Sequence, residues 1–306
     1  MQFEWKGVMP ALTTKFTPSD TLDMELFEEN LALQVEAGVS GIILGGSLGE
    51  ASVLTNAEKE QLVKAALQQL AAKLPVILNI AEGNTSVALE QVRLAEKWGV
   101  QGLMILPPMR YKADDAETVA YFTTIARSTE LPIMIYNNPV DYKINVTLDM
   151  FEQLADCNNI GAIKESTRDV TNVTRLINRF GDRYKILCGV DPLALEELVT
   201  GAVGWVAGLV CAFPRETVAL FALVKAGKIQ EAVQLYRWFM PLLELDIHPK
   251  LVQYIKLAEQ LAGVGTEWVR APRLILQGEE RVAITQVIQH AINTRPILPA
   301  YHELIK

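Results

Sequence analysis

Histidine, cysteine and aromatic residues are scarce in this chain of 306 residues. It has three histidines and three cysteines, and aromatic residues make up 7%. His248, His290 and His302 all fall in the last fifth of the sequence, away from the strand-like segments, so we expect no histidine-based zinc site. The cysteines show no CxxC pairing, which argues against a disulfide framework and favours reduced thiols in a cytoplasmic protein.

The sequence also lacks basic clusters and long apolar runs. Its net charge is −8, and phosphate binding needs concentrated lysine and arginine, so we expect no nucleic-acid partner. No run of 18 apolar residues occurs, and the first ten residues, MQFEWKGVMP, are too polar for a signal peptide. We therefore expect no membrane-spanning segment.

Eight short apolar runs are distributed along the chain, each followed by an amphipathic stretch. They cover residues 7–12, 41–46, 75–80, 102–107, 132–137, 161–166, 185–190 and 204–209. Their Ile, Leu and Val content is typical of buried parallel strands. Eight strand–helix repeats predict an α/β fold, a (β/α)8 TIM barrel. A doubly wound open sheet is the rival, but the first run leads into ALTTKF rather than a Gly-rich dinucleotide turn.

Helical patterns fill the intervals and continue to the end of the chain. Thr55 and Glu58 have the spacing of a capping box, and EAGVSG and KWGVQG place a glycine where a helix would end. From about residue 228 the strand-like runs stop. We predict a barrel over 1–227 and a three-helix C-terminal extension over 228–306, packed as one structural domain.

The ends of the predicted strands carry the candidate catalytic residues. Lys164 closes the sixth apolar run, where partial desolvation would lower its pKa and make it able to form an imine with a carbonyl carbon. The alternative is a structural lysine paired with Glu165. Tyr136 ends the fifth run, one strand away, and is a candidate proton shuttle or a packing residue.

The segment GGSLGE, residues 45–50, follows the second strand. Backbone N–H groups in such a Gly-rich turn can hold an anion. No GK[ST] sequence follows, so a nucleotide-binding P-loop is not supported.

Three blocks together identify a family. GGSLGEASVLTNAEKEQL, MIYNNP and AIKEST resemble, in order and spacing, the N-acetylneuraminate lyase and dihydrodipicolinate synthase family, and the resemblance extends over nearly the whole chain. It implies a lyase without metal or cofactor, in which Lys164 forms the Schiff base and Tyr136 shuttles protons. It also implies a homo-tetramer or homo-dimer.

The resemblance further implies the substrate-binding residues. Gly46, Ser47 and the Leu48 amide should bind the carboxylate of a small 2-oxo acid. The remaining expected contacts are Asp191 after the seventh strand, Ala207 in the eighth, and Arg110 after the fourth. Glu82 is a further candidate for substrate hydroxyls.

Departures from the family pattern argue against dihydrodipicolinate synthesis itself. In this chain Leu48 replaces a second hydroxyl residue of the Gly-rich block, and Asp141 replaces an arginine. Met109 and Arg110 stand where the family has paired tyrosines, Arg168 stands where it has a glycine, and Cys211 stands where it has an asparagine. We expect a dehydratase or deaminase of a hydroxylated 2-oxo acid or its cyclic imine. A pyruvate-releasing aldolase of a short 4-hydroxy-2-oxo acid is the first alternative, and a non-catalytic oxo-acid-binding protein is the second.

Overall fold

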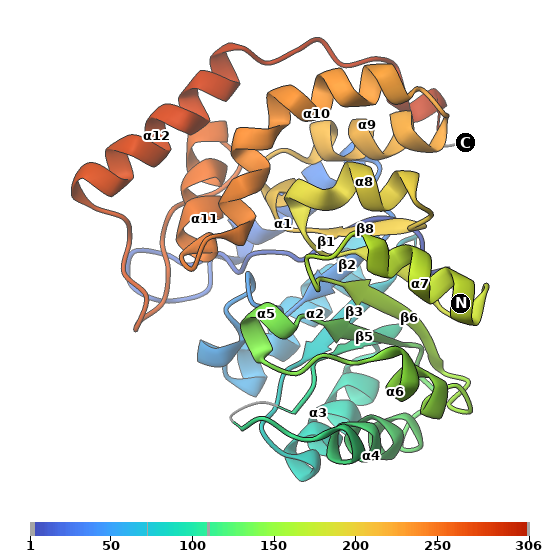
Figure 1. Cartoon of the computed structure of the whole chain (residues 1–306). Helices are drawn as coiled ribbons and strands as arrows, with labels where there is room; N and C mark the ends of the chain where they lie inside the picture. Colours follow the sequence, from blue (N-terminus) through green and yellow to red (C-terminus); the bar gives the residue numbers. More distant parts are fainter. Residues whose placement is uncertain (1–3, 72, 109–110, 305–306) are drawn as a thin grey trace.

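All eight predicted strands form, and they pair into one parallel sheet. The computed structural model describes residues 4–71, 73–108 and 111–304. The strands are β1 (Gly7–Pro10), β2 (Ile42–Leu44), β3 (Val76–Ile80), β4 (Gly102–Ile105), β5 (Ile133–Asn137), β6 (Ile160–Glu165), β7 (Lys185–Cys188) and β8 (Gly204–Ala207). Each lies within one residue of its predicted run, and the sheet runs in the order β1-β8-β7-β6-β5-β4-β3-β2. The predicted α/β barrel is confirmed (Figure 1).

The first and last members of this order meet and close the barrel. The amide of Leu12 donates to the carbonyl of Ile43 at 2.9 Å, and the amide of Ser40 donates to the carbonyl of Val8 at 2.8 Å. The carboxyl ends of all eight strands therefore face one common rim, as parallel strands in a barrel require.

Helices alternate with the strands. The first nine are α1 (Met24–Ala37), α2 (Asn56–Leu70), α3 (Thr85–Trp98), α4 (Asp115–Ala126), α5 (Pro139–Tyr142), α6 (Leu148–Gln153), α7 (Thr171–Phe180), α8 (Ala194–Val199) and α9 (Pro214–Lys225). The predicted capping box of Thr55 and Glu58 is present at the start of α2. Gly38 and Gly99 end α1 and α3 in the left-handed conformation, with φ of 92° and 88°, which glycine adopts without strain.

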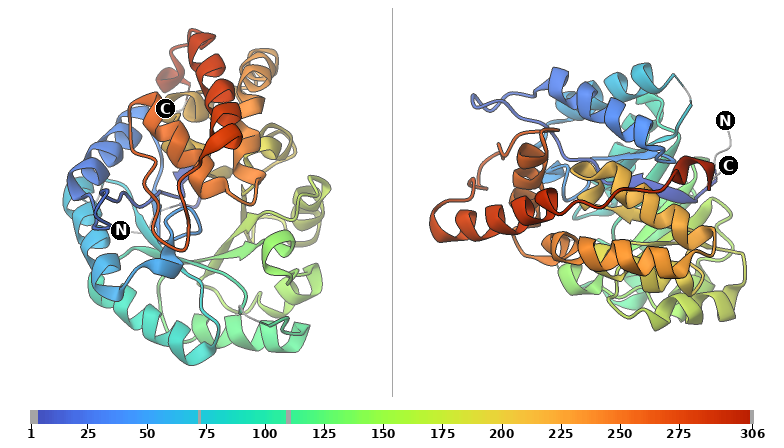
Figure 2. Two further views of the ribbon diagram at one scale, coloured as in Figure 1. Left: turned by 90° about the vertical axis from the view of Figure 1, so that its left-hand side faces the viewer. Right: turned by 90° about the horizontal axis from the view of Figure 1, so that it is seen from above.

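Among the residues that the structure describes, three further α-helices follow α9. They are α10 (Ile229–Leu243), α11 (Leu251–Ala262) and α12 (Gly278–Asn293), and they lie together on the side of the barrel that carries α8 and α9 (Figures 1 and 2). Short 3₁₀ helices are η1 (Ala51–Val53), η2 (Asp191–Leu193), η3 (Leu209–Cys211), η4 (Glu244–Ile247) and η5 (Tyr301–Glu303). Whether 1–227 and 228–306 form one structural domain stays a prediction.

Within the described residues, no α-helix combines the length and the apolar character that crossing a bilayer requires.

Candidate active site

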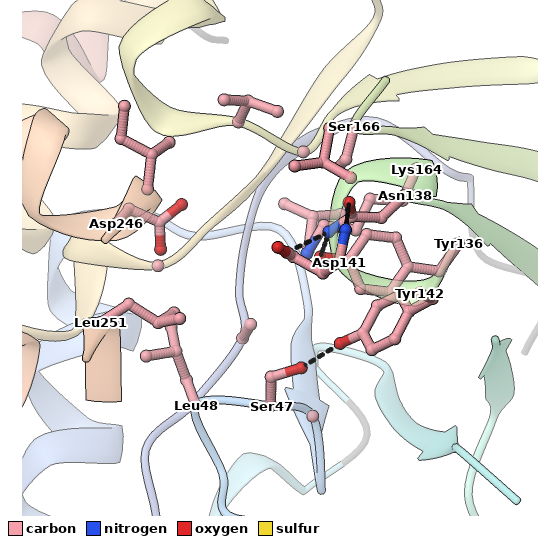
Figure 3. Close-up of a pocket in the computed structure, with 18 of the residues that line it drawn as sticks. Ser47, Leu48, Tyr136, Asn138, Asp141, Tyr142, Lys164, Ser166, Asp246 and Leu251 are labelled. Carbon is pink, nitrogen blue, oxygen red and sulfur yellow. Dashed lines mark hydrogen bonds between the residues drawn. The ribbon is translucent and has the colours of Figure 1, made fainter. Parts of the chain in front are cut away.

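Lys164 lies at the bottom of a cavity at the carboxyl rim of the barrel. The cavity has a volume of about 560 Å³, and the lysine side chain, on β6, is only 6% exposed (Figure 3). Burial lowers the pKa of Lys164, and the charges of Asp246 and Tyr142 offset part of this effect. A lysine in these surroundings carries the neutral amine more often than an exposed lysine does, which is the form that attacks a carbonyl.

The glycine that follows β7 makes room for this lysine. Gly189 follows β7, and a Cβ atom there would lie 2.7 Å from the Cε and Cγ atoms of Lys164 and 2.1 Å from the Ser166 hydroxyl. The absence of a side chain at residue 189 thus allows Lys164 to extend into the cavity. Sequence analysis missed this role of Gly189.

Glu165, the alternative partner for Lys164, is engaged elsewhere. Its carboxylate accepts hydrogen bonds from the backbone of Thr167 and from the side chain of Asn172, both at 2.8 Å. Successive residues of a strand point to opposite faces, so Lys164 faces the barrel interior and Glu165 faces outward. The structure brings Lys164 together with Tyr136 and Asp246 instead.

Tyr136 stands beside Lys164 on the neighbouring strand. The two residues are partners in the register of β5 and β6, and the Nζ atom of Lys164 lies 4.0 Å from the centre of the Tyr136 ring. The side-chain amide of Asn138 donates to the Tyr136 hydroxyl at 3.1 Å and to the Asp141 carboxylate at 2.7 Å. Burial raises the pKa of Tyr136, so the phenol keeps its proton and can donate it.

The loop after β2 forms the opposite wall of the cavity. Gly46, Ser47 and Leu48 all line it, as predicted from the Gly-rich block. The hydroxyls of Ser47 and Tyr142 are 2.6 Å apart, and the Tyr142 ring packs edge-on against Tyr136 with 5.7 Å between ring centres. Tyr142 was not predicted, because it belongs to the short helix α5 rather than to a strand end.

A buried lysine of α11 and a backbone N–H group of the segment after it bind this loop through Glu50. Glu50 is fully buried in the left-handed conformation with φ of 52°, and its carboxylate accepts from Lys256 of α11 at 2.5 Å and from the backbone of Arg270 at 3.1 Å. Fully desolvated ion pairs of this kind are costly to break, because the remaining charge loses its partner. The helical extension therefore helps to position Ser47 and Leu48.

Two predicted contact residues lie behind the cavity wall. Asp191 is fully buried, and its carboxylate accepts from the Trp205 indole at 2.9 Å and from the backbone of Leu209 at 2.7 Å. Ala207 is also fully buried, in register with Pro10 on β1. Their neighbours Val190, Val206 and Gly208 line the cavity instead.

The remaining candidates are placed as follows. Cys211 is fully buried, its thiol donates to the carbonyl of Ala11 at 3.4 Å, and burial raises its pKa to about 12, so it does not act as a thiolate nucleophile. Glu82 follows β3 and is not among the residues that line the cavity. Met109 and Arg110 lie outside the described residues.

The segment after α10 supplies residues that the strand pattern could not predict. Asp246, His248 and Leu251 line the cavity, although they follow the barrel in the sequence. Arg168 lines its mouth and has a φ of 64°, an unusual backbone conformation for a residue with a side chain. Such a conformation is retained where the surroundings require it, often at ligand sites.

Comparison with known proteins settles the family. The sequence model of the Dihydrodipicolinate synthetase family matches residues 4–291. The chain belongs to this family. A relative from Exiguobacterium sibiricum, named 4-hydroxy-tetrahydrodipicolinate synthase, is 32% identical over 275 residues, covering 89% of this chain and 92% of the relative. A relative of the same name from Methanosarcina mazei is 30% identical over 272 residues, covering 88% and 92%.

Solved structures show the same fold. Dihydrodipicolinate synthase from Bacillus anthracis superposes with a TM-score of 0.89 at 27% identity, covering 94% of this chain and 99% of that one. The 4-hydroxy-tetrahydrodipicolinate synthase from Methylacidiphilum fumariolicum gives a TM-score of 0.88 at 28% identity, covering 98% and 99%. The members of this family are lyases that act on small molecules, and the family predicted from the three sequence blocks is confirmed.

Proposed function

We propose that this protein is a lyase that binds a small hydroxylated 2-oxo acid, or its cyclic imine, as a Schiff base on Lys164 and releases water or ammonia. The observation that carries the proposal is the position of Lys164, buried at the bottom of the cavity with its Nζ atom 4.0 Å from the Tyr136 ring centre. An iminium at this position withdraws electrons from the neighbouring carbon and eases bond breaking one atom further along.

The loop after β2 supports binding of the substrate carboxylate. Gly46, Ser47 and Leu48 face the cavity, and a carboxylate at the backbone N–H groups of this turn would lie within reach of the Ser47 hydroxyl. Tyr142, already paired with that hydroxyl, can join the same contact. Such a contact would hold the 2-oxo group in line with Lys164.

The rest of the cavity favours elimination over condensation with a second carboxylate-bearing substrate. Asp141 occupies the position where the resemblance implies an arginine, and its negative charge would repel a second carboxylate that faces it. Leu48 adds an apolar wall near the carboxylate end. We therefore propose that the reaction is not dihydrodipicolinate synthesis, and that Arg168 at the mouth donates to a distal oxygen of the substrate.

Aldol cleavage with release of pyruvate is the second candidate. It requires a base for the C4 hydroxyl, and Asp141, whose carboxylate accepts from Asn138, is the group that favours it. Homo-oligomeric assembly stays a prediction.

A substrate screen with borohydride trapping tests the proposed function. The protein is incubated with pyruvate, sugar-derived 2-oxo acids, hydroxyproline-derived pyrroline acids and sialic acid, with and without borohydride. A 2-oxo semialdehyde formed without carbon–carbon cleavage supports the proposal, whereas pyruvate plus an aldehyde favours the aldolase. A protein that forms no adduct with any of these compounds would contradict Schiff-base catalysis and favour a binding protein.

A further inference from the structure

Asp246 places a carboxyl group in the cavity from outside the barrel. It belongs to η4, between α10 and α11, and this segment packs against η2, which follows β7. Figure 3 shows Asp246 across the cavity from Tyr136 and Tyr142, above Leu48 and Leu251. A substrate held on Lys164 would therefore lie between a phenol on one side and this carboxyl group on the other.

We propose that Asp246 donates the proton to the departing oxygen of the substrate, as a further catalytic residue of this site. The inference rests on the proposed function and adds to it the group that makes elimination possible. A hydroxide ion is a poor leaving group, so an acid at the breaking carbon–oxygen bond accelerates the step.

The contacts of the neighbouring carboxylate decide where the proton lies. Asp191 accepts hydrogen bonds from the Trp205 indole and from the backbone of Gly208 and Leu209, at 2.9, 3.1 and 2.7 Å. These donors stabilise its charged form. Asp191 is fully buried and Asp246 is half-buried. Because two adjacent carboxylates in such surroundings do not both ionise readily, the proton of this pair belongs on Asp246.

The surroundings of Asp246 agree with a protonated acid. Burial raises its pKa well above the ordinary value, the charge of Asp191 raises it further, and Asp141 adds to this effect. The ammonium form of Lys164 and the backbone of Asp191 act in the opposite direction. Because the pKa of Lys164 is itself lowered, Lys164 carries less charge to oppose the raised pKa of Asp246.

Gly208 and Leu48 shape the place where this carboxyl group lies. A Cβ atom on Gly208 would lie 2.2 Å from the Oδ1 atom of Asp246 and 2.8 Å from the Cδ1 atom of Leu48. Glycine at residue 208 thus leaves room for both the carboxyl group and the Leu48 side chain.

The proposed elimination starts with formation of an imine on Lys164. Imine formation joins Nζ of Lys164 to C2 of the substrate, and the C2 oxygen leaves as water with the proton that the Tyr136 phenol donates. The resulting tyrosinate takes the proton from C3, which restores the phenol and leaves an enamine. The electron pair of the resulting enamine forms the C3=C4 double bond as the C4–O bond breaks. The departing oxygen takes the proton of Asp246 and leaves as water. Asp246 regains a proton from solvent, and hydrolysis of the iminium frees the product.

The leaving group provides the test. We compare 4-hydroxy-2-oxopentanoate with its 4-chloro analogue, because chloride leaves without a proton. Asp246→Asn should lower kcat for the hydroxy acid by about 10²–10⁴-fold and should change turnover of the chloro acid by only a few-fold. Gly208→Ala, which displaces the carboxyl group, should show the same selective loss. Glu244→Gln, at an exposed residue of the same 3₁₀ helix, is the matched control and should leave both rates unchanged.

Equal losses with both leaving groups, or no loss with the hydroxy acid, would overturn the assignment of Asp246. A wild-type protein that expels chloride but not hydroxide would also overturn it, because no donor would then be acting. Borohydride trapping with pyruvate separates this result from failure of the proposed function. Asp246→Asn should still form the adduct, whereas absence of an adduct in the wild type would contradict the Schiff base itself.

Discussion

Lys164 and Tyr136 are register partners on adjacent strands, and the lysine Nζ atom lies 4.0 Å from the centre of the phenol ring. Parallel pairing places their side chains on the same face of the sheet, at the same height in the barrel. A buried lysine amine and a phenol with a raised pKa are thereby held side by side by backbone hydrogen bonds. This arrangement is the basis of the first two predictions.

Lys164→Ala should abolish imine formation. Borohydride reduction in the presence of the best substrate, followed by peptide mass spectrometry, should locate one adduct on the wild-type peptide that carries Lys164 and none on the variant. Lys225→Met is the control, because partial burial also lowers the pKa of Lys225 although its amine donates to the carbonyl of Ala202, outside the cavity. An adduct that persists in Lys164→Ala would refute the assignment.

Tyr136→Phe should lower kcat by about 10²–10⁴-fold while leaving the borohydride adduct intact, since the variant keeps the ring and loses only the hydroxyl. Steady-state kinetics with the best substrate measure the change. Tyr121→Phe is the matched control: Tyr121 is likewise buried and burial raises its pKa, but it lies on α4 outside the cavity. Equal kcat in wild type and Tyr136→Phe would mean that another group moves the proton.

Pyruvate and aspartate semialdehyde should give little or no condensation product. The reason is Asp141, whose carboxylate faces the cavity and is held by Asn138 at 2.7 Å. This negative charge would repel a second carboxylate. Product formation is measured beside the Exiguobacterium sibiricum relative as a positive control. Turnover of similar magnitude in both proteins would overturn the substrate argument but not the Schiff base.

The barrel and the neighbouring positions of Lys164 and Tyr136 at its carboxyl rim could be predicted from the sequence, because both depend on strand positions. An apolar run that ends in a polar residue predicts where that residue lies in a parallel barrel, which is why Lys164 and Tyr136 were found. The same logic cannot tell which way a polar side chain turns. Asp191 follows β7 as expected, but its carboxylate is directed toward Trp205 and the backbone of Leu209.

Residues that reach the cavity from helical segments could not be predicted in this way. Asp246 and His248 lie between α10 and α11, and their position depends on how that segment packs on η2. Contacts of the C-terminal helices with the barrel join residues far apart in the sequence, and the buried pair of Lys256 and Glu50 spans 206 positions. No local pattern in the sequence carries that information.

The last prediction concerns stability, and it comes from a second pair of buried carboxyl groups. Glu197 on α8 is fully buried, and burial together with the charge of Glu165 raises its pKa from 4.5 to about 8. Glu165 is stabilised by its hydrogen bonds from Thr167 and Asn172, so Glu197 is the member that keeps a proton. At neutral pH the folded protein therefore holds a proton that the unfolded chain releases.

The stability of the protein depends on pH because the pKa of Glu197 is 4.5 in the unfolded chain and about 8 in the folded protein. Between pH 4.5 and about 8 the unfolded state loses the Glu197 proton while the folded state keeps it, so this group lowers the free energy of unfolding as pH rises, and its effect levels off above about 8. Glu197→Gln keeps the shape of the side chain and removes its titratable proton. The free energy of unfolding is measured in urea for the variant and the wild type at pH 5 and at pH 8. The value for the variant minus that for the wild type should rise by on the order of a few kcal/mol from pH 5 to pH 8. Glu90→Gln, at an exposed residue of α3, should show no such gain. A difference between Glu197→Gln and wild type that is the same at both pH values would show that Glu197 is already ionised in the folded protein, and the assignment of the proton within this pair would then be wrong.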